Sequence, residues 1–375
     1  MQFIDLRRQY SLIKDKVDSA VVNVMNHGKY IMGPEVRQFE CDLAAFVGSR
    51  HAIGCSNGTE ALTMALMALG IGRGDAVFTT PFTFFATTET IAREGATPVY
   101  CDIDPGTYSM DAEKLESAIE KTLAEGRLVP RAICPVDLFG LAADYRRIVP
   151  IARKYNLAII EDAAQALGAV QDGRRAPTFG TIGCTSFFPA KPLGCYGDGG
   201  AVFTDDDSLA ERLRSIVVHG KGADKYDNVR LGLNGRLDTM QAAILIEKLK
   251  IFPNEIEERQ RVAKAYMREL DGIVKLPRIP DGNVSVWAQF CVQHPKRDAI
   301  MAALKDRGIP CNVYYPKPMH LLGAMAYLGL GPGSFPCAEE VSRQVFALPM
   351  HPYLSEDDVA EVSSAVREAL AQTAA

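Results

Sequence analysis

Short apolar runs alternate with helical patterns in the first part of the chain, and this alternation constrains the fold most. The runs cover residues 76–80, 98–103, 132–136 and 157–160. Continuous apolar strands separated by helices indicate a mainly parallel sheet with both faces covered. Residues 59–69, mostly Ala, Leu and Met, predict a nearly buried helix ended by Gly70. The sequence therefore predicts an α/β fold, with ligands beyond the carboxyl ends of the strands.

The pattern changes near residue 251. The helical pattern of residues 240–250 gives way to Phe252-Pro253 and the charged segment 255–259. This change predicts a large domain of residues 1–250 and a smaller α+β domain of residues 251–375. Further strands and helices are expected in the second domain. The expected strands cover residues 287–292 and 310–315, and the expected helices cover residues 297–307 and 355–371.

Charge and composition exclude several classes of protein. The chain has 41 basic and 46 acidic residues without long runs of either sign, which argues against nucleic-acid and anionic-membrane partners. No apolar stretch reaches the roughly 20 residues that span a bilayer, and residues 1–8 lack a signal-peptide core. We therefore expect a cytoplasmic protein.

The nine cysteines are scattered and form no CxxC pair. This spacing suggests neither a zinc site nor a disulfide framework. We expect reduced, mostly buried cysteines and no bound metal.

Lys191 is the first candidate for chemistry. It lies in residues 186–200, where no other charged residue precedes Asp198 and where Phe, Pro, Leu and Tyr surround it. Loss of hydration favours a neutral amine, which can attack a carbonyl group to form a Schiff base. Taken alone, the segment is more typical of a surface lysine beside a glycine-rich hairpin, since most lysines are solvated.

Asp162 is the second candidate, because it directly follows the apolar run 157–160 and Glu161. A carboxylate at that position can keep a pyridinium nitrogen protonated and make the ring an electron sink. Ala164 leaves room for a flat ring, and Gln165 is able to hydrogen-bond a ring substituent. The alternative is a helix N-cap for residues 163–166.

A third segment, residues 55–62 (Cys-Ser-Asn-Gly-Thr-Glu-Ala-Leu), places Gly58 and Thr59 at a helix start. Free backbone N–H groups there can bind phosphate, although an ordinary capped helix has the same pattern. Ser186 offers a further phosphate ligand. A lysine for an aldehyde, an acid for a pyridine nitrogen and a helix start for a phosphate together indicate pyridoxal 5′-phosphate (PLP).

The chain resembles the DegT/DnrJ/StrS family of nucleotide-sugar aminotransferases along its whole length. The resemblance implies the PLP-dependent transferase type I fold, similar to aspartate aminotransferase, and homodimers that share their active sites. It is carried by six motifs. They cover residues 3–6, 31–36, 57–62, 161–166, 197–201 and 234–243.

The family pattern implies a role for each matching residue. Lys191 would hold the cofactor as a Schiff base and carry the proton, and Asp162 would pair with the pyridine nitrogen. Gln165 would contact the 3′-oxygen, and Phe84 would stack on the ring opposite Ala164. For Phe84, ordinary core packing is the alternative.

The remaining cofactor contacts implied by the family concern the phosphate. Gly58, Thr59 and Ser186 would bind it within one subunit. Asn234 would reach the phosphate of the neighbouring subunit, whereas the residues alone favour a turn residue between Gly232 and Gly235.

Within the family the chain is most similar to the enzymes that aminate UDP-2-acetamido-2-deoxy-3-oxo-D-glucuronate with L-glutamate for surface polysaccharide (O-antigen) synthesis. Residues 185–189, 191–200 and 348–354 carry this likeness. Tyr314 departs from it, since a histidine is usual there, and Trp287 replaces a smaller aromatic residue. The alternative substrate is a 4-keto-6-deoxy hexose linked to dTDP or UDP.

A substrate with a diphosphate and a uronate requires local positive groups, because the chain has a net charge of −5. Arg236 is the candidate carboxylate clamp, and an ion pair with Asp238 is its alternative. Other candidates for sugar or diphosphate contacts are weaker. They are Lys29, Tyr314, Tyr315, Lys317 and His320.

Two further functions are compatible with the same fold. A sugar 3-dehydratase would have a histidine in place of Lys191, so the lysine argues against it. A non-catalytic sensor or scaffold is disfavoured by the joint presence of Lys191, Asp162, Gln165 and Ser186.

Overall fold

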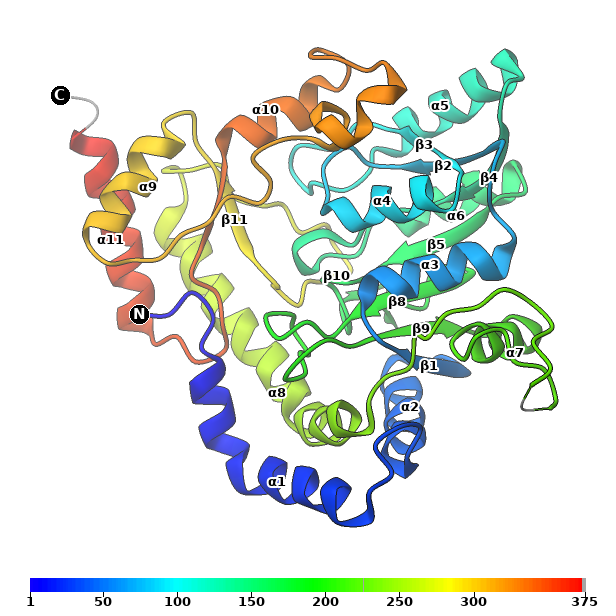
Figure 1. The fold of residues 1–375 in the computed structure, drawn as a ribbon. Helices are drawn as coiled ribbons and strands as arrows, with labels where there is room; N and C mark the ends of the chain where they lie inside the picture. The colour runs from blue at the N-terminus through cyan, green and yellow to red at the C-terminus, as the bar shows by residue number, and fades with distance from the viewer. Residues whose placement is uncertain (225, 373–375) are drawn as a thin grey trace.

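The computed structural model describes residues 1–224 and 226–372. Its centre is a seven-stranded sheet in the order β1-β9-β8-β5-β4-β2-β3 (Figure 1). Strands β8, β5, β4, β2 and β3 are parallel, and β9 is antiparallel to both of its neighbours. The mainly parallel sheet predicted from the alternation is thus confirmed. The strands are β1 (His51–Cys55), β2 (Asp75–Thr79), β3 (Thr97–Tyr100), β4 (Val129–Ile133), β5 (Ala158–Asp162), β8 (Ile182–Ser186) and β9 (Gly200–Thr204).

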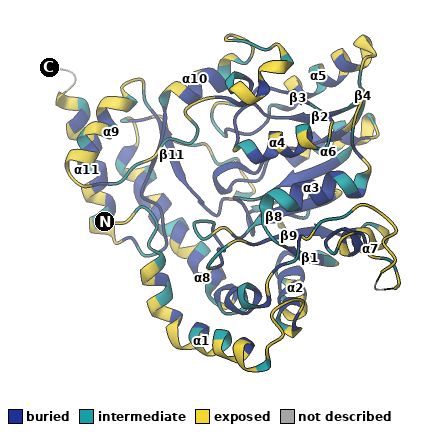
Figure 2. Cartoon of the chain, viewed as in Figure 1, coloured by how far each residue is buried: buried dark blue, intermediate teal, exposed yellow. Residues whose placement is uncertain are grey.

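Helices cover both faces of this sheet, which explains why most residues of its strands are apolar. One core lies between the sheet and α3, α4 and α7, and a second lies between the sheet and α5 and α6. Helix α3 is mostly buried, as expected (Figure 2), and ends at Gly70 with φ 63°. The helices are α1 (Leu6–His27), α2 (Pro34–Val47), α3 (Gly58–Leu69), α4 (Phe85–Arg93), α5 (Ala112–Glu125), α6 (Tyr145–Lys154) and α7 (Asp207–Ile216).

A smaller region follows along the chain. Strands β11 (Phe290–Gln293) and β12 (Val345–Leu348) form an antiparallel pair that shares a core with α9 (Arg297–Asp306) and α11 (Glu356–Gln372). The helices predicted at 297–307 and 355–371 are therefore confirmed. The short elements are η1 (Leu138–Gly140), β6 (Val170–Gln171), β7 (Arg174–Arg175), β10 (Asn283–Val284), η2 (Met319–Leu321), η3 (Gly323–Leu328) and α10 (Pro336–Gln344).

Helix α8 (Thr239–Leu270) runs through the predicted domain boundary (Figure 1). The expectation that this helix ends near residue 250 is wrong. Pro253 removes one backbone donor, but Phe252 and Glu255 on either side are buried and hold the helix in place. The division into residues 1–250 and 251–375 stays a prediction.

Residues 310–315 form no strand, contrary to expectation. Only Asn312 in this segment makes a β-bridge, with Ala347. All nine cysteines are free, and six of them are buried, as expected. No helix in the described ranges is long and apolar enough to cross a bilayer.

Candidate active site

Asp162 is the last residue of β5, the strand in the middle of the sheet. Its Oδ2 accepts from the Thr87 hydroxyl at 2.7 Å, and its Oδ1 accepts from the Ala164 N–H at 3.2 Å. Burial raises the pKa of this carboxyl, while these hydrogen bonds and the charge of Lys191 oppose the shift. Residues 164–168 form a turn, so Asp162 is not a helix N-cap.

Lys191 lies in the loop after β8, and its backbone N–H donates to the Phe188 carbonyl at 2.8 Å. Burial of the amine lowers its pKa to about 8, and the nearby Asp162 carboxylate works in the opposite direction. An amine with that pKa is partly neutral near physiological pH. The structure thus favours the chemical interpretation of Lys191 over a solvated surface lysine.

This pKa predicts the pH dependence of cofactor capture. Below about pH 8 Lys191 is an ammonium ion without a lone pair, so the rate at which the cofactor-free protein binds PLP should rise with pH and level off above that value. Stopped-flow absorbance measures this rate. Buried Lys248 also has a pKa lowered to about 8, so Lys248→Met is the matched control and should leave the midpoint unchanged. A midpoint near 10.5, the ordinary lysine value, would contradict the assignment.

The predicted phosphate ligands lie together at the start of α3. A Cβ on Gly58 would be 2.7 Å from the Cβ of Ser186, so only glycine allows this approach. The Asn57 side chain caps the helix by accepting from the Glu60 N–H at 2.8 Å. Within the described chain the N–H groups of Gly58 and Thr59 have no acceptor. These free donors suit a phosphate.

Aromatic side chains lie around Gln165. Gln165 Nε2 donates to the Tyr315 hydroxyl at 3.0 Å, and its Oε1 accepts from the Phe139 N–H at 2.8 Å. Phe84 is 57% exposed, and its ring centroid is 6.3 Å from that of Tyr315. Because Phe84 is open to solvent, the structure does not support the core-packing alternative for it.

Arg236 and Asn234 lie beside the turn that precedes α3. Arg236 forms an antiparallel bridge with Cys55, and Asn234 is exposed. In the described ranges Arg236 makes no ion pair with Asp238 or any other acid, and its buried Nε has no partner. The ion-pair interpretation of Arg236 is therefore wrong for this chain.

Besides Tyr315, three predicted sugar contacts lie in residues 314–320 and differ in their surroundings. Tyr314 packs against Phe3 with ring centroids 6.3 Å apart, and Lys317 is exposed. The His320 side chain is 0% exposed, and its Nε2 lies 3.1 Å from Glu339 Oε1. His320 is thus a packed residue held by Glu339, and the expectation that it contacts the sugar lacks geometric support.

Thr87 is a site residue that the sequence analysis missed. It lies in the first turn of α4, three residues after Phe84, and it holds the Asp162 carboxylate. The helical spacing from Phe84 is the signal that would have identified it.

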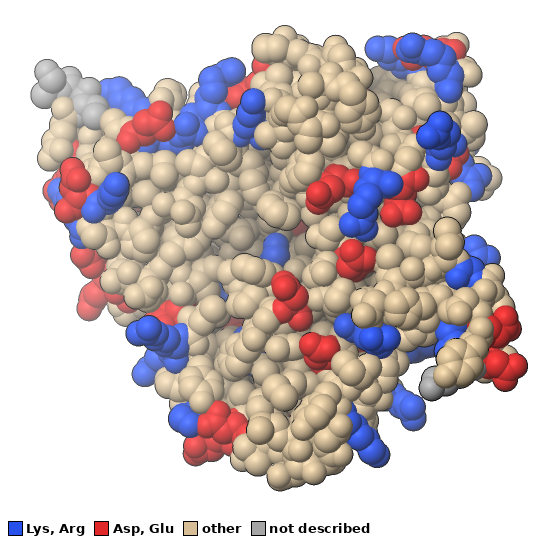
Figure 3. All heavy atoms as spheres, in the orientation of Figure 1, with Lys and Arg blue, Asp and Glu red and all other residues tan. Residues whose placement is uncertain are grey.

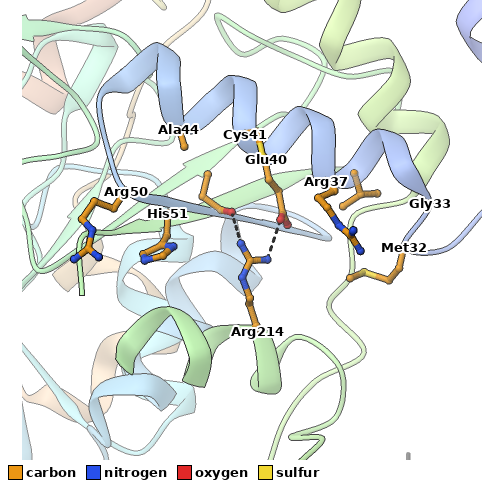
Figure 4. Close-up of a pocket in the computed structure, with 11 residues that line it drawn as sticks. Met32, Gly33, Arg37, Glu40, Cys41, Ala44, Arg50, His51 and Arg214 are labelled. Atoms are coloured by element: carbon orange, nitrogen blue, oxygen red, sulfur yellow. Dashed lines mark hydrogen bonds and ion pairs between the residues drawn. The ribbon is translucent and has the colours of Figure 1, made fainter. Parts of the chain in front are cut away.

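Figure 3 shows one face of the molecule with a central hollow that contains a basic side chain among mostly uncharged atoms. A separate pocket of about 490 Å³ lies between α2, β1 and α7 (Figure 4). There Glu40 accepts from the Gly54 N–H at 2.8 Å, and Arg214 bonds both Glu40 and the Ala52 carbonyl. These bonds satisfy the free edge of β1, which is a structural role.

The residues at the carboxyl ends of β1, β5 and β8 fit PLP. They offer free N–H groups for its phosphate, a buried carboxylate for its ring nitrogen and a desolvated amine for its aldehyde. In the described ranges no cluster of three or more His, Cys, Asp or Glu residues is arranged to hold a metal ion.

The fold and the site define a PLP-dependent aminotransferase of fold type I. Residues 11–367 match the DegT/DnrJ/EryC1/StrS aminotransferase family, and the chain belongs to it. It is 47% identical to a UDP-2-acetamido-2-deoxy-3-oxo-D-glucuronate aminotransferase of Pseudomonas aeruginosa, over 98% of this chain and 99% of that protein.

Two solved structures share the fold. One is a DegT DnrJ EryC1 StrS aminotransferase from Brucella abortus, with a TM-score of 0.96, 51% identity and coverage of 98% of this chain and 99% of that one. The other is NtdA from Bacillus subtilis with bound cofactor PMP, with a TM-score of 0.88, 29% identity and coverage of 99% and 83%.

Proposed function

We propose that this aminotransferase transfers the amino group of L-glutamate to UDP-2-acetamido-2-deoxy-3-oxo-D-glucuronate, in the cytoplasm, for O-antigen synthesis. The observation that carries the reaction class is the desolvated Lys191 amine beside buried Asp162. The substrate is supported by the near full-length similarity to the Pseudomonas aeruginosa enzyme.

Each residue has a distinct task in this proposal. Bound PLP supplies a ring that accepts electrons from the carbon losing its proton. Lys191 anchors the cofactor and moves that proton, and Asp162 keeps the ring nitrogen protonated. Thr87 orients the Asp162 carboxylate through its 2.7 Å hydrogen bond. Gly58 and Ser186 hold the phosphate and thereby fix the position of the ring.

The uronate is the part of the substrate that needs a dedicated cation. Arg236 offers parallel guanidinium donors, and its Nε has no partner within the described chain. An arginine without an acid partner beside the α3 start suits a carboxylate ligand. Arg236 is therefore our proposed uronate clamp.

Replacement of this arginine should change specificity more than catalysis. Arg236→Met is expected to lower kcat/KM for the UDP-3-amino-glucuronate by about 10- to 100-fold, because a charge-assisted hydrogen bond is lost. The matched UDP-3-amino sugar without the carboxylate should react equally well with both proteins. An equal loss for both sugars would contradict the clamp.

We further propose a homodimer that shares its active sites. Tyr30, Ile31 and Met32 are each more than half exposed, and Leu231 is 87% exposed, which is unusual for apolar side chains. The Tyr30 carbonyl accepts from the Thr239 N–H, so this apolar segment adjoins the segment that carries Asn234 and Arg236. A second copy that covers these residues would meet exposed Asn234 at the same surface.

Reverse half-reactions test the substrate directly. The yellow PLP form of the enzyme is mixed with single amino-sugar nucleotides, and conversion to the pyridoxamine form is followed by absorbance. Bleaching by the UDP-3-amino-glucuronate alone is expected. Bleaching by a 4-amino-6-deoxy sugar would instead establish the alternative substrate class, and absence of a yellow form would overturn the cofactor assignment.

A further inference from the structure

Two buried carboxyl groups lie directly behind Asp162 and have no task in the proposed reaction. Asp137 follows β4, Glu161 precedes Asp162 in β5, and both residues are 0% exposed. Among the described residues no lysine, arginine or histidine forms an ion pair with either. Buried carboxylates without a cation are costly, so this pair needs an explanation.

The hydrogen bonds of the two groups are complementary. Asp137 Oδ1 accepts from the Ala143 N–H at 2.8 Å and the Tyr145 hydroxyl at 2.9 Å. Glu161 Oε2 accepts from the N–H groups of Phe179 at 2.7 Å and Gly180 at 2.9 Å.

Each group thus keeps one further oxygen, Asp137 Oδ2 and Glu161 Oε1. Both oxygens are buried and lack a donor. The geometry brings the two side chains together: Val136 bridges Asp162, and the Tyr145 ring, whose hydroxyl donates to Asp137, stacks on Phe179, whose N–H donates to Glu161, with ring centroids 4.5 Å apart. A single proton between them would satisfy both oxygens at once.

We propose that Asp137 and Glu161 share one proton and that this acid pair is a positioning device for Asp162 and Gln165. The inference rests on the proposed function, because the tasks of Asp162 and Gln165 belong to that proposal. Glu161 carries the proton and donates it in a hydrogen bond, and Asp137 is the anion, so the pair has one negative charge.

The backbone transmits this arrangement to the site. The Asp137 N–H donates to the Asp162 carbonyl at 2.9 Å, and the Asp162 N–H donates to the Pro135 carbonyl at 3.0 Å. The Phe139 N–H donates to Gln165 Oε1 at 2.8 Å. The segment that follows β4 therefore holds both cofactor-facing residues, and the acid pair fixes that segment against β5.

The electrostatic surroundings agree with this assignment of the proton. Burial raises the pKa of both groups, and the neighbouring Asp137 charge raises that of Glu161 further. The titratable groups that face the pair are Tyr145 from α6, Asp162 from β5, Cys134 directly after β4 and Cys184 from β8. None of them supplies a positive charge.

Amide substitutions test the shared proton, since an amide replaces a protonated carboxyl. In Asp137→Asn or Glu161→Gln alone, the amide donates to the remaining carboxylate and the pair keeps one hydrogen bond and one negative charge. In the double variant two NH₂ groups face each other, so the hydrogen bond and the negative charge are both lost. Melting of the cofactor-free proteins and PLP affinity by absorbance titration are measured for all four proteins.

Each single variant should melt within about 5 °C of the parent and bind PLP within about threefold of it. The melting temperature of the double variant should fall by at least twice the sum of the two single-variant shifts, or the protein should fail to fold. Any folded double variant should bind PLP at least about tenfold more weakly than the parent. Additive melting shifts, or single variants as damaged as the double one, would overturn the shared proton. Unchanged PLP affinity in a folded double variant would overturn the positioning role. These measurements use no sugar substrate, so a failure of the acid-pair proposal can be distinguished from a failure of the proposed substrate.

Discussion

Lys191→Ala is expected to abolish transamination, with a fall of about 10³-fold or more, while the protein remains folded. The reason is that one amine both anchors the cofactor and moves the proton, and alanine removes both tasks. Lys191 lies in a loop after β8, outside the helices and strands, so circular dichroism should be unchanged. Glutamate-dependent loss of the yellow form measures the activity.

The sharpest control for this experiment is the second buried lysine. Lys248 lies in α8 and is 1% exposed, and its amine is 4.9 Å from the centroid of the Tyr196 ring. Lys248→Met keeps the volume and should retain activity, because an apolar side chain replaces a buried charge. Borohydride reduction followed by peptide mapping should place the cofactor on residue 191. Cofactor on residue 248, or full activity of Lys191→Ala, would show that the wrong lysine was assigned.

The alternation of strands and helices was sufficient to predict the parallel part of the sheet and α3. Local signals acted together there, since apolar runs and the stop at Gly70 both agreed with the final structure. Local signals failed where tertiary packing decided the outcome. Pro253 lies inside α8 because its neighbours are buried, and residues 310–315 make a single bridge instead of a strand.

The same distinction applies to the site. Lys191 and Asp162 could be identified from the sequence because the residues that indicate their chemistry are adjacent to them in the chain. The hydroxyl that holds Asp162 comes from Thr87, 75 residues away, and Gln165 meets Tyr315 across 150 residues. The acid pair could not be predicted either, because only the fold brings the segment with Asp137 beside the end of β5 that carries Glu161. Pairings of this kind depend on the order of the strands, which a single sequence does not provide.

Asp162→Asn is expected to lower kcat by about 10²- to 10³-fold and to leave the fold intact. The asparagine oxygen can still accept from the Ala164 N–H, and its NH₂ group can donate to the Thr87 hydroxyl oxygen, so the geometry of the β5 end should persist. What disappears is the negative charge that keeps a proton on the ring nitrogen, and with it the electron-accepting power of the ring. Single-turnover kinetics with glutamate measure the effect on the proton-transfer step.

Substitutions of Thr87 separate the charge of Asp162 from its orientation. Thr87→Val removes the hydroxyl that stabilises the ionised carboxylate, so the pKa of Asp162 should rise further and kcat should fall by about tenfold. Thr87→Ser keeps the hydroxyl and should behave like the parent. A higher pH should partly restore Thr87→Val, because it ionises Asp162 again, whereas Asp162→Asn has no carboxyl group to ionise. If both variants responded equally to pH, the carboxylate charge would not be the quantity that Thr87 controls.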